Sequence, residues 1–170
     1  LNKGTTDSTL TYSYVPTDTT DTGVSVSSSD PSVATATVAE ATKTVTIKAL
    51  AKGSTVITVA SSKDSSKSAT CNVTVHVPLE SISLDKTVLD LNPGLTGTLT
   101  VTYIPSDTDA AKSVTWATSD SSVATVSAEG TVTAGTTYGT ATITATSTAF
   151  LADGKTHATA TCTVNVTERI

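Results

Sequence analysis

Methionine is absent from the 170-residue sequence, cysteine occurs twice, and the aromatic residues are four Tyr, one Trp and one Phe. Charge is also scarce, because charged residues make up 15% of the chain and leave a net charge of −5. Without a basic field to collect phosphates, we expect no nucleic-acid partner and no anionic membrane surface. No apolar run approaches the roughly 18 residues of a membrane span, which argues against membrane insertion.

The first residues show neither an initiator Met nor a signal peptide. We therefore expect the chain to begin inside a longer protein or after processing. Its cellular location has to be inferred from other features.

Threonine is present in excess. It supplies roughly a quarter of the chain, and Thr with Ser roughly a third, far above ordinary usage. Thr and Val are β-branched and suit a pleated, half-buried surface. Hydrophobic residues still reach 37%, which is enough apolar surface for small cores. The composition therefore predicts an ordered, all-β protein.

The sequence contains an internal repeat. SDPSVAT at 29–35 returns as SDSSVAT at 119–125, ninety residues later. Further matching pairs are LTYSYVP at 10–16 with LTVTYIP at 99–105, GSTVITV at 53–59 with GTATITA at 139–145, and ATCNVTV at 69–75 with ATCTVNV at 160–166. Repeats of about 80–90 residues have the size of small sandwich domains. We predict a first domain at 1–77 and a second at 78–170.

Within each repeat, every second residue of the apolar blocks is hydrophobic, as in Ala141-Thr-Ile143-Thr-Ala145. This period of two indicates strands with one buried and one wet face. Short strands at roughly ten-residue spacing, divided by Gly, Pro, Asp and Ser, are typical of a β-sandwich. The strands predicted for the second repeat are 81–84, 88–91, 97–104, 113–118, 122–127, 130–134, 139–147 and 156–167.

The first repeat has no counterpart of LESISLDKTVLD at 79–90, because Leu1 aligns with Leu91. We expect its first strand to lie before Leu1, or to be supplied by another chain at the open sheet edge. Pro78 stiffens the short junction between the repeats, which favours two sandwiches arranged end to end.

Residues 114–146, VTWATSDSSVATVSAEGTVTAGTTYGTATITAT, resemble the group 2 bacterial immunoglobulin-like domains. The first repeat departs from the pattern by placing Val26 where the second has Trp116. The resemblance implies tandem immunoglobulin-like Greek-key sandwiches of the intimin and invasin type. It also implies surface-displayed repeats of adhesins, wall-associated enzymes and intimin-like proteins, or modules of phage virions. It does not imply catalysis.

Three residues are expected to be buried for structural reasons. Trp116 shares the phase of its strand's apolar residues, and Cys71 and Cys162 share the phase of the valines that follow them. The two thiols belong to different predicted domains, and a disulfide needs Cα atoms within about 7 Å. We therefore predict two free, buried thiols rather than a disulfide.

Catalytic, cofactor and metal sites find no support in the motifs. No nucleophile elbow, phosphate loop or zinc-protease motif is present, and His76 and His157 lack ligand spacing. We read Asp30 and Asp120 as turn formers. Acidic residues also gather after a proline in each repeat, where a solvated turn is favoured over a Ca²⁺ site: Asp18, Asp21, Asp107 and Asp109.

A candidate contact loop follows from STAFLADGKTH at 147–157, an insertion relative to the first repeat. It places Phe150, the only Phe of the chain, beside Leu151 in a predicted loop, and Tyr138 is a second loop aromatic. Exposed apolar loop tips often mark contact sites. The alternative is that Phe150 folds back and caps the sandwich.

These features favour a non-catalytic, extracellular structural and adhesive module that acts as a stiff spacer or surface-binding repeat of a bacterial surface protein. Its partners would be neighbouring immunoglobulin-like domains or a parent protein, and a host-surface protein or glycan. One alternative is a phage virion accessory, in which the module decorates a capsid or fibre. Another is a carbohydrate-binding appendage of a secreted enzyme, with Tyr138 or Phe150 as the aromatic platform.

Overall fold

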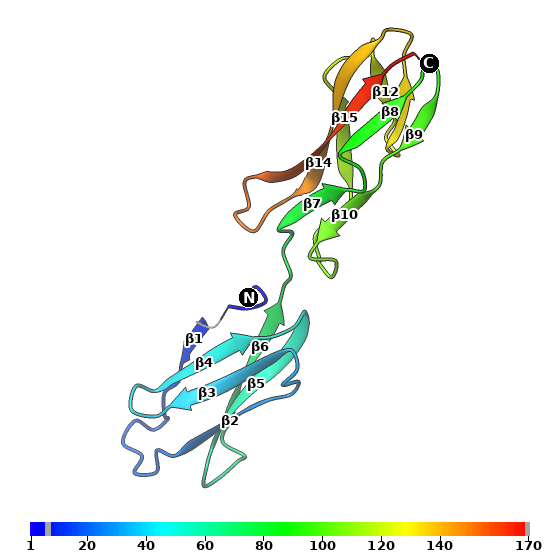
Figure 1. Cartoon of the computed structure of the whole chain (residues 1–170). Coiled ribbons are helices and arrows are strands. Elements are labelled where there is room, and N and C mark those ends of the chain that lie inside the picture. Colours follow the sequence, from blue (N-terminus) through cyan, green and yellow to red (C-terminus); the bar gives the residue numbers. More distant parts are fainter. Residues whose placement is uncertain (6–7, 169–170) are drawn as a thin grey trace. The chain divides into compact units, whose positions relative to one another are not determined.

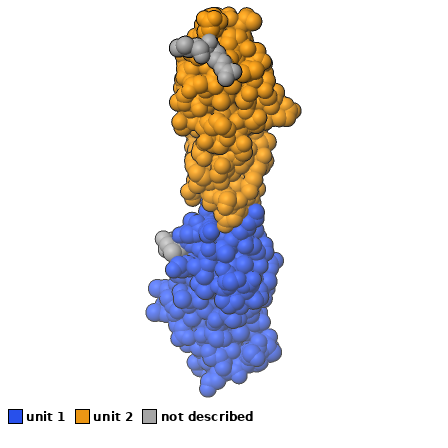
Figure 2. Space-filling model, turned by 45° about the vertical axis from the view of Figure 1, so that its right-hand side comes forward, with its two compact units in different colours: residues 1–77 blue, residues 78–170 orange. Residues whose placement is uncertain are grey.

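The computed structural model describes residues 1–5 and 8–168 and contains two compact units, residues 1–77 and 78–170 (Figure 2). Every regular element in the described residues is a β-strand, which confirms the predicted all-β class. No helix in this part of the chain is long and apolar enough to cross a membrane.

The first unit consists of two three-stranded antiparallel sheets (Figure 1). One has the order β1-β4-β3 and the other β2-β5-β6. The strands are β1 (Ser8–Thr11), β2 (Val24–Ser28), β3 (Ala34–Ala39), β4 (Thr44–Ala49), β5 (Gly53–Ser61) and β6 (Ser68–Val75).

The second unit repeats this plan and adds three strands, β7, β8 and β10. Its sheets have the orders β11-β14-β15-β8, β12-β13-β9 and β10-β7, and all pairs are antiparallel except β15 with β8. The strands are β7 (Ser81–Leu84), β8 (Val88–Leu91), β9 (Thr96–Thr98), β10 (Val101–Ile104), β11 (Val114–Thr118), β12 (Ala124–Val126), β13 (Thr131–Ala134), β14 (Gly139–Phe150) and β15 (His157–Val166).

Each unit buries its own core between the inner faces of its sheets. In the second unit, Val132 on one sheet packs in a cluster with Ile143 and Val164 on the other, and all three have no exposed surface. In the first unit, Ile47 and Ile57 take the same places, each 1% exposed. The threonines between these positions face outward or lie at half-buried sites, as the period of two requires.

The strand predictions for 81–84 and 88–91 match the structure, and two others need correction. The segment predicted as one strand, 97–104, is two strands that belong to different sheets. The chain changes sheet at Leu99 and Thr100, where the Thr100 N–H donates to the Asp85 carboxylate at 2.7 Å. Strand β14 also runs three residues beyond its predicted end, because it keeps pairing with β15 as far as Phe150.

Six strands correspond between the two units, with β2-β5-β6 matching β11-β14-β15 and β1-β4-β3 matching β9-β13-β12. Strands β7, β8 and β10 of the second unit have no counterpart strand among the described residues of the first. What remains there is a single parallel bridge between Asn2 and His76.

Candidate contact surface

The hairpin of β14 and β15 is held in shape by a buried serine. Its register shifts between Thr146 and Phe150, so the chain bulges there. Ser147, 2% exposed, fills the bulge: its hydroxyl donates to the Ala149 carbonyl at 2.7 Å and accepts from the Ala158 N–H at 2.9 Å. Because this hydroxyl satisfies backbone groups from both strands, the bulge is a fixed feature of the hairpin.

The turn of the hairpin is closed by Asp153. Its carboxylate accepts hydrogen bonds from the Lys155 and Thr156 N–H groups, at 2.9 and 3.0 Å, and from the Thr156 hydroxyl at 2.6 Å. The Thr156 hydroxyl, followed by the two backbone donors, lowers the pKa of Asp153. Gly154 takes a φ of +66°, which L residues rarely adopt. These hydrogen bonds and the conformation of Gly154 therefore define the turn at the tip of the hairpin.

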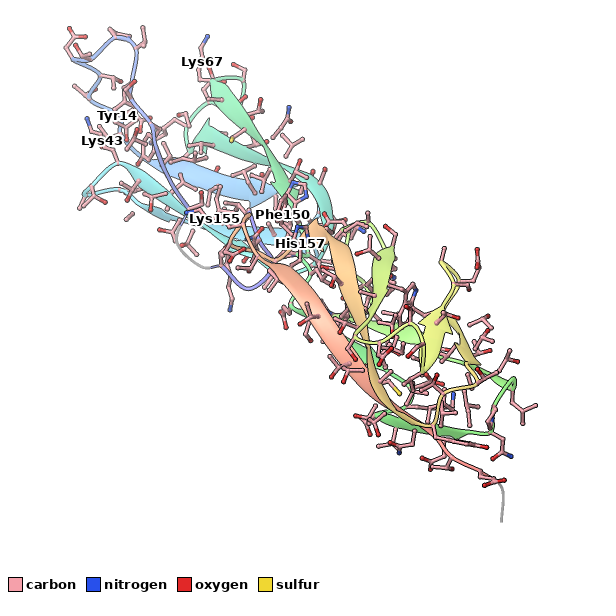
Figure 3. All side chains as sticks on the ribbon, turned by 90° about the horizontal axis from the view of Figure 1, so that it is seen from above. Tyr14, Lys43, Lys67, Phe150, Lys155 and His157 are labelled. Carbon is pink, nitrogen blue, oxygen red and sulfur yellow. The ribbon has the colours of Figure 1, made fainter. Side chains whose placement is uncertain are left out.

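Phe150 stands at this tip with about half of its surface exposed, 51%. Its ring packs against the His157 ring on the paired strand, with 4.4 Å between the centroids (Figure 3). His157 is oriented in turn by a contact of 3.2 Å between its Nδ1 atom and the Ala149 oxygen. Phe150 is the last residue of β14 and not, as predicted, part of a loop, because β15 supplies a pairing partner that far along the hairpin.

The other two residues of the predicted contact loop do not share an exposed surface with Phe150. Leu151 is half-buried, bridges to Leu79 and packs on that end of the core. Tyr138 is 56% exposed but precedes β14, whereas Phe150 ends it. A twelve-residue strand spans roughly 35–40 Å. Phe150 and Tyr138 therefore belong to opposite ends of the second unit and form no common surface.

The residues predicted as structural are packed to different degrees. Cys162 has no exposed surface, and burial raises the pKa of its thiol. Cys71 is free and half-buried at the margin of the first unit's core. Trp116 is also half-buried and packs against both core clusters of the second unit. A Cβ at Gly130 would lie 2.9 Å from the Trp116 ring, so the indole covers that glycine closely.

Asp30 and Asp120 act as turn formers. The Asp30 carboxylate accepts from the Ser32 N–H and hydroxyl, at 3.0 and 2.5 Å, and Asp120 accepts from the same groups of Ser122 at 2.9 and 2.7 Å. The serine hydroxyl, then its N–H, lowers the pKa of each carboxyl. The described residues contain no group of three or more His, Cys, Asp or Glu that could hold a metal ion.

An apolar hollow of about 630 Å³ opens in the first unit. Its walls include Tyr12, Tyr14 and Lys67, the last two labelled in Figure 3. The Tyr12 hydroxyl is buried without a hydrogen-bond partner among the described residues, and burial raises the pKa of Tyr12 to about 12. Sequence reasoning predicted an open sheet edge here but not the hollow behind it, because side-chain volume is not visible in a strand pattern.

A smaller hollow of about 400 Å³ lies in the second unit. It is shallow and combines the half-buried rings of Tyr103 and Trp116 with the charged side chains of Lys112 and Glu129. No sequence motif pointed to it, because its residues come from separate strands and turns.

Comparison with known proteins identifies relatives. The family model of the bacterial Ig-like domain (group 2) matches residues 78–164. An uncharacterized protein of Clostridium acetobutylicum is 41% identical over 86 residues, which are 51% of this chain and 9% of that protein. The chain therefore spans only a small part of this relative.

Two solved structures are also similar. Domains 4 and 5 of the S-layer protein SbsC match 88% of this chain and 72% of theirs, at 24% identity and a TM-score of 0.44. A 282-residue C-terminal fragment of intimin, in complex with the intimin-binding domain of its translocated receptor, matches 93% of this chain and 56% of the fragment, at 15% identity and a TM-score of 0.41.

The family match covers just over half of the chain and includes the whole of 114–146, the segment that carried the resemblance in the sequence. It confirms that resemblance and the immunoglobulin-like fold. The chain belongs to the bacterial immunoglobulin-like domain family, group 2.

Proposed function

We propose that this chain is a non-catalytic, load-bearing and adhesive module of a bacterial surface protein. The observation that carries the proposal is the parallel ladder between β8, near the start of the second unit, and β15, at its end. Force applied across the ends of the unit loads the hydrogen bonds of this ladder together, in shear. A ladder loaded in this way resists extension better than one that opens bond by bond.

The ladder is well defined. The Thr163 N–H donates to the Thr87 carbonyl at 2.8 Å and the Thr167 N–H to the Leu91 carbonyl at 3.2 Å. The Asn165 side-chain amide adds a bond of 2.7 Å to the Asp90 carboxylate. Since alternate residues of β8 face β15, the Leu89 N–H faces the ladder and the Asp90 N–H faces away from it.

Single-molecule force spectroscopy of residues 1–170 tests the mechanical role. We expect two unfolding events, the stronger from the second unit, and Leu89→Pro should weaken only that event by removing a ladder donor. Val88→Pro is the matched control, because the Val88 N–H also faces away from β15 and its side chain is 52% exposed. Leu89→Ala accounts for the loss of the Leu89 side chain from the core. Equal effects of the two proline substitutions, or a weaker second unit, would refute a load-bearing role for the ladder.

The adhesive part of the proposal rests on Phe150. An exposed aromatic ring fixed by a paired histidine and a closed turn is pre-organised for contact. Immobilised chain can be probed with arrays of glycans and with purified host-surface proteins. Phe150→Ala should abolish binding and Tyr138→Ala, at the other end of the unit, should leave it unchanged. Absence of any binding, or equal loss in both variants, would count against contact through this hairpin.

A carbohydrate-binding appendage is the second candidate, and the shallow hollow of the second unit favours it. Ligand pockets combine aromatic walls with a few polar or charged groups, and a sugar ring offers an apolar face and hydroxyls to such a site. On the same glycan array, this candidate requires that Lys112→Ala and Glu129→Ala weaken binding while Phe150→Ala does not.

A further inference from the structure

One edge of β11, in the second unit, has no neighbouring strand. Strand β11 is the terminal strand of its sheet and pairs only with β14. The Ser119 N–H just beyond it donates to the Thr142 carbonyl at 3.0 Å. Because antiparallel pairs alternate, the N–H and C=O groups of Val114 and Trp116 face the other way, toward the open edge. In the part of the chain that the structure describes, these backbone groups have no hydrogen-bond partner.

The aligned edge of the first unit is capped. There the N–H of Val24, the counterpart of Val114, donates to the Glu40 carboxylate at 3.2 Å. Strand β11 lacks this cap, and it also lacks the usual protections of an edge strand, since it contains no charged residue, no proline and no bulge. An edge of this kind accepts an added strand.

The hollow of about 400 Å³ in the second unit lies directly beside this edge. Val114 and Trp116 form one part of its wall, and Val101 and Tyr103 of β10 form another. Side chains of a strand alternate between the two faces of its sheet. A strand added to β11 would therefore direct every second side chain toward the inner face, where the hollow can receive one of them.

Charges of opposite sign flank the edge. Lys112 precedes the first residue of β11, and Asp120 follows the last one. An antiparallel added strand would bring its C-terminal end to Lys112 and its N-terminal end to Asp120. The edge therefore complements a segment with a basic residue before its apolar side chain and an acidic residue after it. Lys112 and Glu129 both line the hollow, so an uncharged side chain fits it best.

We propose that the open edge of β11 binds an extended segment of another protein as an added antiparallel strand. Main-chain hydrogen bonds to Val114 and Trp116 hold the segment in place. One large apolar side chain of the segment fills the hollow beside the Trp116 ring. Main-chain pairing supplies the affinity in this mode of recognition, and the hollow selects the side chain.

The structure favours a peptide over the other two occupants of this edge. Donors and acceptors that recur along the edge every second residue, roughly 7 Å apart, match another main chain rather than a sugar ring. A second copy would offer its own β11, but its Trp116 is packed against its own core clusters. Pairing of two copies would therefore leave no side chain to enter the hollow.

The test begins with a phage library of random linear peptides panned on immobilised chain of residues 1–170. We expect the enriched peptides to alternate in polarity, with a basic residue before and an acidic residue after a large apolar one. An enriched peptide, made synthetically, should slow hydrogen exchange of the Val114 and Trp116 amides about tenfold or more. The Thr115 and Ala117 amides, which face β14, should be unchanged.

Val114→Pro removes one outward donor and leaves the pairing of β11 with β14 intact, so it should weaken binding of the synthetic peptide about tenfold. Val114→Ala accounts for the lost side chain and should have a smaller effect. Phe150→Ala changes the hairpin and should have none. N-methylation along the peptide needs no change in the chain, and it should abolish binding at alternate positions only.

The proposal is overturned if panning enriches no peptide, if the synthetic peptide binds Val114→Pro as well as the unaltered chain, or if N-methylation shows no alternation. An array glycan that displaces the peptide and leaves exchange of the Val114 and Trp116 amides unchanged would overturn it in favour of a sugar. A concentration-dependent dimer of residues 1–170 in which these two amides are protected would overturn it in favour of a second copy.

Discussion

Replacing Ile143 by Ala tests whether each unit has an independent core. Ile143 is fully buried between the two sheets of the second unit, and its counterpart in the first is Ile57. The substitution removes three carbon atoms, worth about 2.4 kcal/mol of transfer free energy at ~0.8 kcal/mol each. The remaining cavity brings the expected loss of unfolding free energy to about 3–4 kcal/mol, since facing strands restrict collapse.

For a domain of this size, each kcal/mol shifts the melting temperature by roughly 4–8 °C. We therefore expect the transition of the second unit to fall by about 15–25 °C in differential scanning calorimetry, while that of the first stays within error. Ile57→Ala is the matched variant and should do the reverse. The reasoning is refuted if either substitution moves both transitions together, because the chain would then unfold as one cooperative body.

Three further predictions concern local features. Gly130→Ala should destabilise the second unit by more than about 2 kcal/mol in chemical denaturation, since its φ is +82° and its Cβ would lie 2.6 Å from a backbone oxygen. Gly154→Ala, with positive φ but open space, should cost only about 1 kcal/mol. Because the pKa of Asp120 is lowered by folding, its carboxylate stabilises the second unit above the unfolded pKa, and this stabilisation is lost as pH falls through the folded pKa. Asp120→Asn should therefore reduce the fall of the melting temperature at acid pH. A melting temperature with the same pH dependence in the variant contradicts this. Cys71 should react with a thiol reagent well before Cys162, which is buried and has a raised pKa; equal rates would count against the packing of Cys162.

The strands could be predicted because period-two burial is a local property of the sequence. Residues 141–145 and 162–166 alternate between a dry and a wet face, so the pattern itself locates them. The break at Leu99 and Thr100 was missed because alternation continues through it. The strand ends there because the chain changes its pairing partner: β9 pairs with β13 before the break, and β10 pairs with β7 after it.

The candidate contact surface was predicted less well, for a similar reason. The insertion at 147–157 correctly drew attention to Phe150 as an exposed ring. Its loop setting and its grouping with Leu151 and Tyr138 depended on how far two strands pair. That length is set by the bulge at Ser147 and the turn at Asp153, which combine contacts from both strands.

In a chain with few charges and few large aromatic residues, local hydrogen bonds of the polar side chains fix the turns and connect the strands. The carboxylates with lowered pKa are held by neighbouring hydroxyl, amide or lysine groups, which fixes turns. Ser147 and Thr55, which are buried, bridge backbone and side-chain groups of adjacent strands. A thin core of Val, Ile and Ala then suffices, because local hydrogen bonds fix the turns and bulges that a larger core would otherwise have to fix.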